Sequence, residues 1–407
     1  MNGDDLYIVG VGASAGGLEA LEAFFSHMPT TDRMAFVVVQ HLSPDYKSLM
    51  GELLAKHTRM PIAHAEDGVE VEAGSIYLIP RKKNMTLYKG KLFLSEQQHG
   101  LNLPIDIFFT SIAEDAGERA VGIVLSGTGS DGTRGIRAIK EAGGMVAVQD
   151  EESAKFNGMP RSAISTGIVD YVLPPDQLPR ELVHYTSGTI RIRPSGEADD
   201  GGEQASPSGL AKVFLLIKRR TGVDLSFYKE TTRVRRIDRR MVIKQISEFP
   251  AYVELLETSP AEVQTLFKEI LIGVTKFFRD GDAFETLKQR VFPHIFADAP
   301  QTVRIWVAGC STGEEAYTMA ILVSEYMETN SLHANVKIFA TDIDKDAIEF
   351  ASKGHYPESI VADASSDRLQ RYFVRKGDSY HVKASIREMV IFAYHNIFKD
   401  PPFRKID

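Results

Sequence analysis

Short apolar runs and helical patterns alternate along the first half of the chain. The runs predicted as strands are rich in β-branched residues and are Leu6–Val11, Ala35–Val39, Ala120–Ser126 and Met145–Val148. The segments with helical spacing are Leu18–Phe25, Ser48–Lys56 and Thr133–Ala142. Strands that are apolar throughout and alternate with helices are typical of a parallel sheet covered on both faces. The pattern therefore predicts a doubly wound α/β domain.

The second half begins with helical periodicity alone and then returns to alternation. Leu210–Leu287 has apolar positions at helical spacing and almost no strand pattern. Buried strands are predicted at Arg304–Ala308, Val336–Ala340 and Met389–Tyr394, with a helix at Glu314–Met327. Ser379–Val382 is expected to be a small strand in an insertion. We expect a small all-α subdomain followed by a Rossmann-like unit.

A stretch without bulky apolar residues separates the two halves. From about Ser187 to Gly209 the chain is rich in glycine, serine, proline and acids, and after Ile192 it cannot bury enough surface to become ordered. We therefore predict a first domain at 1–186, a flexible linker at 187–208, a helical subdomain at 209–283 and a Rossmann-like domain at 284–407.

Composition and charge indicate the protein's compartment and exclude some classes of partner, but they do not indicate its reaction. The 407 residues are 43% hydrophobic and 25% charged, which excludes wholesale disorder, and the net charge of −8 does not favour nucleic acid as a partner. A single cysteine, Cys310, excludes internal disulfides and multi-cysteine zinc sites and favours a reducing cytoplasm. No metal site is predicted. No run reaches the ~20 apolar residues of a membrane span, and the first residues lack a signal-peptide pattern.

The first chemical candidate is a serine in a glycine-rich turn. Gly12-Ala13-Ser14-Ala15-Gly16 fits the pattern G-x-S-x-G between a predicted strand and a predicted helix. Flanking glycines permit a sharp turn that raises the Ser14 hydroxyl above the sheet, and the N-terminus of the next helix suits a developing oxyanion. The turn alone fits a helix cap or a phosphate loop equally well. It also comes near a dinucleotide fingerprint, although its last glycine has the wrong spacing.

Two further polar residues follow predicted strands. His41 comes just beyond Ala35–Val39, and Asp131 lies in the glycine-rich stretch after Ala120–Ser126. Taken singly, a surface histidine and a turn or capping aspartate are the commoner interpretations. Because parallel strands end at one edge of a sheet, Ser14, His41 and Asp131 can form a triad. In it serine attacks, histidine takes the serine proton and aspartate orients the imidazole.

Four motifs, in this order, are similar to those of the catalytic domain of chemotaxis receptor methylesterases (CheB type): G-A-S-A-G-G at Gly12, Q-H-L-S-P-D at Gln40, L-S-G-T-G-S-D-G at Leu125 and F-N-G-M-P-R-S-A at Phe156. The resemblance covers nearly all of residues 5–185. It implies Ser14 as nucleophile, His41 as base and Asp131 as orienting acid, with no cofactor. The implied substrate is a glutamyl methyl ester on a receptor's cytoplasmic helix, and such enzymes also deamidate certain glutamines. The receiver domain that precedes some relatives is not expected here, because the chain begins almost on the first strand.

A second glycine turn, Gly309–Gly313, joins a predicted strand to a predicted helix. Glu314 and Glu315 follow in the first helical turn, where the helix dipole stabilises carboxylates. Two anions at this position argue against a phosphate ligand and favour a cationic or zwitterionic one. Asp342, at the end of the next strand, is placed to bind ribose hydroxyls. Capping acids and a turn aspartate explain the same spacing equally well.

The segments around this turn resemble CheR-type chemotaxis receptor methyltransferases. They are Gly273–Asp280, the turn itself, Ala340–Asp344 and His395–Ile397. By this resemblance S-adenosylmethionine contacts Thr275, Arg279, Glu314, Asp342, Asn396 and the backbone of Ile397. Relatives continue beyond Asp407, so this domain is expected to be partial, incomplete at the C-terminus, with Arg404–Asp407 as the opening of a core strand.

Lys218–Arg220 and Arg233–Arg240 form a basic stretch on predicted helices. A solvated helix face is the plain interpretation, and the acidic balance of the whole chain argues against nucleic-acid binding. The resemblance implies a third interpretation, which we favour, in which the basic helix docks on the acidic methylation helices of a receptor.

These features together predict a cytoplasmic bifunctional enzyme without direct membrane insertion. It would hydrolyse glutamyl methyl esters and, with S-adenosylmethionine, methylate glutamates on the cytoplasmic helices of methyl-accepting chemotaxis receptors. Two alternatives stay open. In one, the methyltransferase half is degenerate and only anchors the esterase to its receptor. In the other, a serine hydrolase acts on small esters unrelated to receptors.

Overall fold

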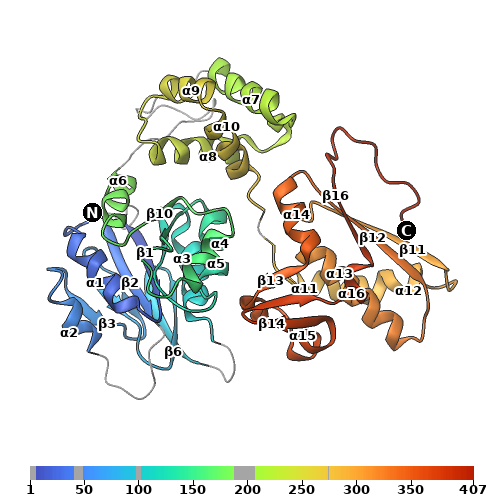
Figure 1. Ribbon diagram of the computed structural model, residues 1–407, viewed down its shortest axis with the longest axis horizontal. Helices are drawn as coiled ribbons and strands as arrows, with labels where there is room; N and C mark the ends of the chain where they lie inside the picture. The colour runs from blue at the N-terminus through green and yellow to red at the C-terminus, as the bar shows by residue number, and fades with distance from the viewer. Residues whose placement is uncertain (1–5, 41–48, 98–101, 188–206, 274) are drawn as a thin grey trace. The chain divides into compact units, whose positions relative to one another are not determined.

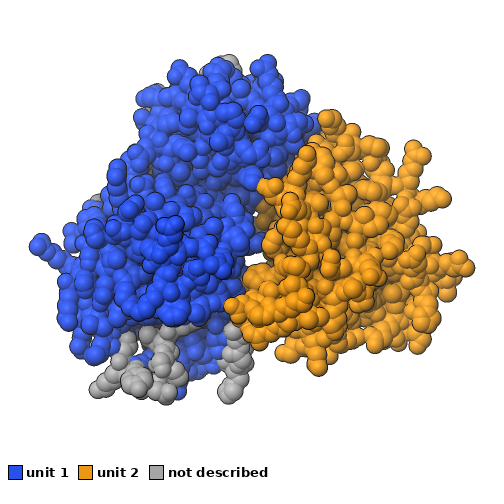
Figure 2. Space-filling model, in the orientation of Figure 1, with its two compact units in different colours: residues 1–272 blue, residues 273–407 orange. Residues whose placement is uncertain are grey.

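The structure is a computed structural model that describes residues 6–40, 49–97, 102–187, 207–273 and 275–407 (Figure 1). The chain forms two compact units, Met1–Ile272 and Gly273–Asp407, which Figure 2 colours separately. The first unit contains a sheet domain and a helical domain, and the second is a Rossmann-like domain. Among the described residues, no helix has the length and apolar character that crossing a membrane requires.

The sheet domain is built on seven parallel strands in the order β10-β9-β8-β1-β2-β5-β3. Their bounds are β1 (Tyr7–Ala13), β2 (Met34–Gln40), β3 (Ile62–His64), β5 (Ile76–Leu78), β8 (Ala120–Val124), β9 (Met145–Gln149) and β10 (Tyr171–Leu173). In the centre, Gly12 of β1 lies opposite Val124 of β8 and Val39 of β2. The carboxyl ends of these three neighbouring strands therefore meet at one edge of the sheet.

Helices cover both faces of this sheet, because its central strands are apolar on both sides. In β2, Phe36 and Val38 belong to one buried cluster, and Val37 and Val39 to the other. The first face is covered by α1 (Gly17–His27), α2 (Met50–Leu54) and α6 (Leu178–Ser187), and the second by α3 (Pro104–Ala116), α4 (Thr133–Ala142) and α5 (Gly158–Ile164). The 3₁₀ turn η2 (Gly117–Arg119) joins α3 to β8. The predicted doubly wound α/β fold is confirmed.

Two glycines of β1 are explained by packing and not by a turn. A Cβ atom on Gly10 would lie 2.7 Å from the Phe109 ring, and one on Gly12 would lie 2.5 Å from Ile105, both on α3. The prediction that Gly12 belongs to the turn was wrong, because β1 continues to Ala13. The turn glycine is Gly16, whose φ of 69° is in the left-handed region that glycine adopts without strain.

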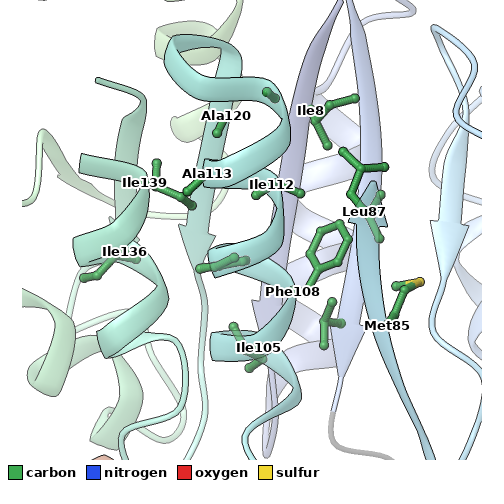
Figure 3. Close-up of a cluster of buried hydrophobic side chains, with 14 of the residues drawn as sticks. Ile8, Met85, Leu87, Ile105, Phe108, Ile112, Ala113, Ala120, Ile136 and Ile139 are labelled. Carbon is green, nitrogen blue, oxygen red and sulfur yellow. The ribbon is translucent and has the colours of Figure 1, made fainter. Parts of the chain in front are cut away.

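A small antiparallel sheet, which the periodicity did not predict, packs against α3. Its strands, in the order β4-β7-β6, are β4 (Val69–Glu70), β6 (Lys83–Tyr88) and β7 (Lys91–Glu96). Figure 3 shows Met85 and Leu87 of β6 beside Phe108 of α3 in the same apolar cluster as Ile8. The Ser111 hydroxyl of α3 accepts the backbone N–H of Leu87 at 2.9 Å. This sheet therefore helps to hold α3 in place.

The helical domain consists of helices, as predicted for Leu210–Leu287. Its elements are α7 (Pro207–Thr221), the 3₁₀ turn η3 (Leu225–Phe227), α8 (Glu230–Ile243), α9 (Phe249–Thr258) and α10 (Pro260–Ile270). A buried bidentate ion pair joins α8 to α10, since the Arg240 guanidinium donates to both Glu262 oxygens at 2.8 and 2.7 Å. The Tyr252 hydroxyl of α9 donates to the same carboxylate at 3.0 Å, so three helices share one charged centre.

The Rossmann-like domain has three parallel strands in the order β11-β12-β16. They are β11 (Thr302–Ala308), β12 (Asn335–Asp342) and β16 (Val390–Tyr394), all close to the predicted runs. The helical elements are α11 (Gly281–Thr286), η4 (Leu287–Val291), α12 (Phe292–Ile295), α13 (Glu314–Thr329), α14 (Lys345–Lys353), η5 (Glu358–Ala362), α15 (Ser366–Tyr372) and α16 (Ala384–Arg387). The strand predicted at Ser379–Val382 is β15, the centre of an antiparallel sheet with β13 (His355–Pro357) and β14 (Phe373–Lys376).

Two local predictions need a correction or a limit. Arg404–Asp407 does not form a strand. Within this segment, Asp407 forms the hydrogen bonds to β11. Its backbone N–H donates to the Arg304 carbonyl, and its side-chain carboxylate accepts the Arg304 N–H. Because a side chain takes the place of the backbone carbonyl, these bonds do not form a strand ladder. The predicted linker 187–208 lies outside the described residues apart from its ends, which belong to α6 and α7.

Candidate active sites

Ser14 is the first residue after β1, at the carboxyl edge of the sheet. Its backbone N–H donates to the Ser126 carbonyl at 3.0 Å, and its carbonyl accepts the Gly17 N–H at 2.9 Å. Helix α1 begins at Gly17, directly after the left-handed Gly16. Main-chain bonds on both sides therefore fix the position of Ser14 beside the N-terminus of α1, and its side chain takes no part in them.

The loop after β8 and the segment before α5 complete the surroundings of Ser14. The Ser126 hydroxyl donates to the Ala15 carbonyl at 2.9 Å and accepts the Phe156 N–H at 3.0 Å. A Cβ atom on Gly127 would lie 2.9 Å from the Cβ of Ser14 and 2.1 Å from the sulfur of Met159. Ser126 and Phe156 were not singled out as site residues, although both lie in the motifs that carry the resemblance.

Asp131 lies in the turn between β8 and α4 and is 2% exposed. Its carboxylate accepts the backbone N–H groups of Ile105 and Asp106 at 3.0 and 2.9 Å, and that of Gly132 at 2.9 Å. It therefore caps the N-terminus of α3, a helix distant in sequence, and not only its own turn. A carboxylate has about four lone-pair sites, so this arrangement fixes Asp131 without exhausting its capacity as an acceptor.

The structure brings two of the three predicted triad positions to one edge. Ser14 follows β1, and Asp131 lies in the turn that connects the neighbouring β8 to α4. His41 lies outside the described residues. The strand before it, β2, pairs with β1 on the other side and ends at Gln40.

A second carboxyl group, which the sequence analysis did not consider, is buried behind Asp131. Asp106 accepts the Gly135 N–H on one oxygen at 2.7 Å, and its other oxygen is buried with no hydrogen-bond partner among the described residues. Burial, together with the negative charge of Asp131, raises the pKa of Asp106 to about 8, against the opposing charge of Arg134. Asp106 therefore keeps its proton at neutral pH.

The glycine turn after β11 is held by the carboxylate at the end of β12. Gly309, Ser311 and Gly313 all have left-handed backbone conformations, with φ of 75°, 47° and 93°. The Asp342 carboxylate accepts the Ser311 N–H at 2.7 Å on one oxygen and the Asp344 N–H at 2.9 Å on the other. These bonds stabilise the strained serine and fix the orientation of Asp342.

Acidic side chains gather around this turn. Glu314 is buried at the start of α13 and accepts the Thr312 hydroxyl at 2.6 Å. Burial, followed by the charges of Asp342, Glu314 and Glu315, raises the pKa of Cys310 to about 12, so its thiol stays protonated. The local field therefore favours a cation.

Two other segments reach the same edge. Burial, followed by the charge of Asp280, raises the pKa of Glu315, and the nearby Arg279 guanidinium opposes this shift. Thr275, four residues before Arg279, is half-buried. After β16, buried Asn396 accepts the Phe398 N–H at 3.0 Å, and Ile397 is exposed. The preceding residue, His395, donates its N–H to the Asp342 carbonyl at 3.0 Å, which places this segment beside the end of β12.

Three segments of the chain match two families of chemotaxis enzymes. Residues 9–182 match the CheB methylesterase family. Residues 208–271 match the all-alpha domain of CheR methyltransferases, and residues 273–407 match their SAM binding domain. A chemotaxis protein methyltransferase of Borreliella burgdorferi is 31% identical over 204 residues, which are 48% of this chain and 72% of that protein. The chain therefore belongs to the CheR methyltransferase family, and its first part, residues 9–182, is similar to CheB methylesterases.

Other relatives share one or both parts of this arrangement. An uncharacterised 104.1 kDa protein of Rhodobacter capsulatus is 40% identical over 381 residues, which are 88% of this chain and 40% of that protein. A protein-glutamate methylesterase/protein-glutamine glutaminase of Anaeromyxobacter dehalogenans is 36% identical over 186 residues, 44% of this chain and 53% of that protein. The chain thus spans about half, or less, of the length of these two curated relatives.

Three of the five arginines of α8 are not part of the exposed receptor-docking face predicted from the CheR resemblance. Arg236, Arg239 and Arg240 are each 5% exposed or less. Arg240 is paired with Glu262 inside the helical domain, and the other two bond to groups of the sheet domain. Their charges are already compensated within the first unit. The exposed basic residues of the stretch include Lys218, Arg219 and Arg220 at the end of α7.

Proposed function

We propose that the sheet domain hydrolyses glutamyl methyl esters on the cytoplasmic helices of chemotaxis receptors. The observation that carries this proposal is the position of Ser14 at the end of β1, in contact with the β8 loop that leads to a firmly held Asp131. The CheB match over residues 9–182 and the name of the Anaeromyxobacter relative support the same chemistry. By the same comparison we propose deamidation of certain receptor glutamines as a second reaction.

In the proposed reaction, the Ser14 hydroxyl attacks the ester carbonyl carbon while His41 takes its proton. Asp131 orients the imidazole, and the backbone N–H of Ala15 stabilises the oxyanion. Methanol leaves with the proton from His41, and water then hydrolyses the acyl-enzyme. The neutral state of Asp106 matters here, because a second negative charge beside Asp131 would disturb the electrostatic balance of the triad.

Methanol release distinguishes this function from hydrolysis of unrelated small esters. The full chain should release methanol from a methylated receptor cytoplasmic fragment much faster than it hydrolyses soluble aryl esters. The fragment without methyl esters is the matched control. Hydrolysis of aryl esters with no methanol from the methylated fragment would overturn the proposed substrate.

We propose that the Rossmann-like domain, with the helical domain, methylates receptor glutamates using S-adenosylmethionine, which supplies the methyl group. A glutamate is ionised at pH 7, so the transfer requires placement and exclusion of water but no general base. The residues present fit this cofactor, because Glu314, Glu315 and Asp342 create a field that favours a sulfonium cation. Asp342 would bind the ribose, and Thr275, Arg279, Asn396 and the backbone of Ile397 would contact the rest of the cofactor.

Replacement of Asp342 by alanine should weaken S-adenosylmethionine binding by roughly 10- to 100-fold, since hydrogen bonds to a charged group contribute about 1.5–3 kcal/mol. Titration calorimetry of the full chain measures this. Asp378→Ala, in an exposed turn of the same domain, is the matched control. The fluorescence of Trp306, whose indole donates to Thr341 at 2.9 Å, reports whether the sheet edge stays folded. An unchanged affinity in a folded Asp342→Ala variant would contradict the ribose role. Absence of binding by the unmodified chain would instead favour a degenerate, receptor-anchoring half.

We also propose that the protein is cytoplasmic and that its domains follow the order predicted from the sequence. The matched ranges 9–182, 208–271 and 273–407 support a division into an esterase domain, a helical domain and a cofactor-binding domain. They favour a start of the last domain at about residue 273, earlier than the predicted 284.

A further inference from the structure

Four buried charged side chains form a closed ring between the sheet domain and the helical domain. The sheet domain contributes Lys140 of α4 and Asp170, and the helical domain contributes Arg239 of α8 and Glu269 of α10. Lys140 lies 2.5 Å from Asp170 and 2.8 Å from Glu269. Arg239 lies 2.6 Å from Glu269 and also bonds to Asp170. We call this set the charge ring.

The composition of the charge ring suits an interface between two separately folded domains. The side chains are 0–7% exposed, so each charge has left water and depends on its partners. Each domain contributes one cation and one anion, and these two side chains are paired with each other. The charges that each domain brings to the interface therefore add up to zero. Asp170 is fixed further because it accepts the Val146 N–H of β9 at 2.8 Å. Two neutral pairs thus join into a ring of alternating charge.

A second contact continues the interface along α8. The Arg236 guanidinium donates to the carbonyls of Lys140 and Glu141 at 2.9 and 3.3 Å. These carbonyls belong to the last turn of α4, where a cation is stabilised by the helix dipole. The interface therefore recognises both the charge and the end of one particular helix.

The rim of this interface is also complementary. Arg235 of α8 lies 3.5 Å from Glu118, and the two side chains are 38% and 59% exposed. At the C-terminal end of α8, the Tyr171 hydroxyl of β10 donates to the Ile243 carbonyl at 3.4 Å. The contacts thus include a buried centre and an exposed edge that can be changed separately.

We propose that the arginine face of α8, formed by Arg235, Arg236 and Arg239, is a docking surface for the sheet domain of the same chain. The all-α domain of the methyltransferase part is then bound to the methylesterase domain through these contacts. The segment between α6 and α7 is rich in glycine, serine and acids, a composition typical of flexible linkers. Such a linker does not fix one domain against another, so we attribute the association of the two domains to their noncovalent contacts. While it is docked, this face is closed to the acidic helices of a receptor. The proposal does not depend on either enzymatic activity.

The test uses the full chain with a protease site inserted between residues 188 and 206, cut after purification. At micromolar concentration and physiological salt, the two fragments should co-sediment in the analytical ultracentrifuge. Arg239→Met should raise their dissociation constant at least tenfold, because it leaves the remaining ring charges unbalanced. Arg219→Met, at an exposed position of α7, is the matched control and should leave association unchanged.

The rim pair keeps the test decisive if Arg239→Met does not fold. Arg235→Glu should weaken association of the fragments, and Glu118→Arg in the same chain should restore it, since the exchanged pair can form again. Fragments of the unmodified chain that sediment separately would overturn the proposal. So would folded Arg239→Met fragments that associate as tightly as the unmodified ones, or an Arg235→Glu defect that Glu118→Arg does not relieve.

Discussion

Replacement of Ser14 by alanine is expected to lower methanol release by about 10,000-fold or more while the protein stays folded. The loss follows because no other group in the proposed triad can form the acyl-enzyme. The fold should survive because the bonds that hold this turn, to Ser126 and Gly17, use only the main-chain atoms of Ser14. The measurement is the initial rate of methanol release from a methylated receptor fragment.

Ser165→Ala is the matched control for this variant. Ser165 lies in the same domain at an exposed position, and its hydroxyl donates to the nearby Ser162 carbonyl. It should retain the full rate. Thermal unfolding followed by circular dichroism should be the same for the two variants and the unmodified chain. A folded Ser14→Ala protein with a rate comparable with the unmodified chain would remove the nucleophile assignment.

Replacement of Asp106 by asparagine is expected to stabilise the sheet domain increasingly as pH rises from about 4 to about 8. An unfolded aspartate ionises near pH 3.9, whereas burial and the charge of Asp131 raise the pKa of folded Asp106 to about 8. Between these values the folded state binds one more proton than the unfolded state, so rising pH favours unfolding by up to about 1.4 kcal/mol per pH unit. Asparagine does not titrate and keeps the oxygen that accepts the Gly135 N–H.

The difference between variant and unmodified chain should be smallest near pH 4 and level off above pH 8. Hydrogen–deuterium exchange in urea, read on peptides from α3 and β8 and corrected for the intrinsic rate at each pH, measures it. Asp176→Asn, at an exposed position of the same domain, should show no such trend. A difference that is constant over this pH range would contradict the buried, protonated state of Asp106.

The elements that the sequence predicted well are those with a strong, uninterrupted pattern. Helix α4 has the predicted bounds Thr133–Ala142, and β12 extends the predicted Val336–Ala340 by one residue at the start and two at the end. The antiparallel sheet of β4, β6 and β7 was missed because its strands are short and mix buried with exposed residues. Gly12 was assigned to a turn because a glycine in a strand looks the same in sequence as a glycine in a turn. The structure distinguishes the two cases, because Ile105 lies too close to Gly12 to leave room for a side chain there.

The order of its motifs was by itself enough to indicate that this chain combines a CheB part with a CheR part, and that Ser14 and Asp131 each follow a predicted strand. That information is local, because each motif is a few consecutive residues at the end of one apolar run. The protonation of Asp106, the capping of α3 by Asp131 and the use of the α8 arginines were decided only by the tertiary structure. Each depends on burial and on partners many positions away, such as Arg239 with Asp170. The energy of a charge is set by what surrounds it in space and not by its neighbours in sequence.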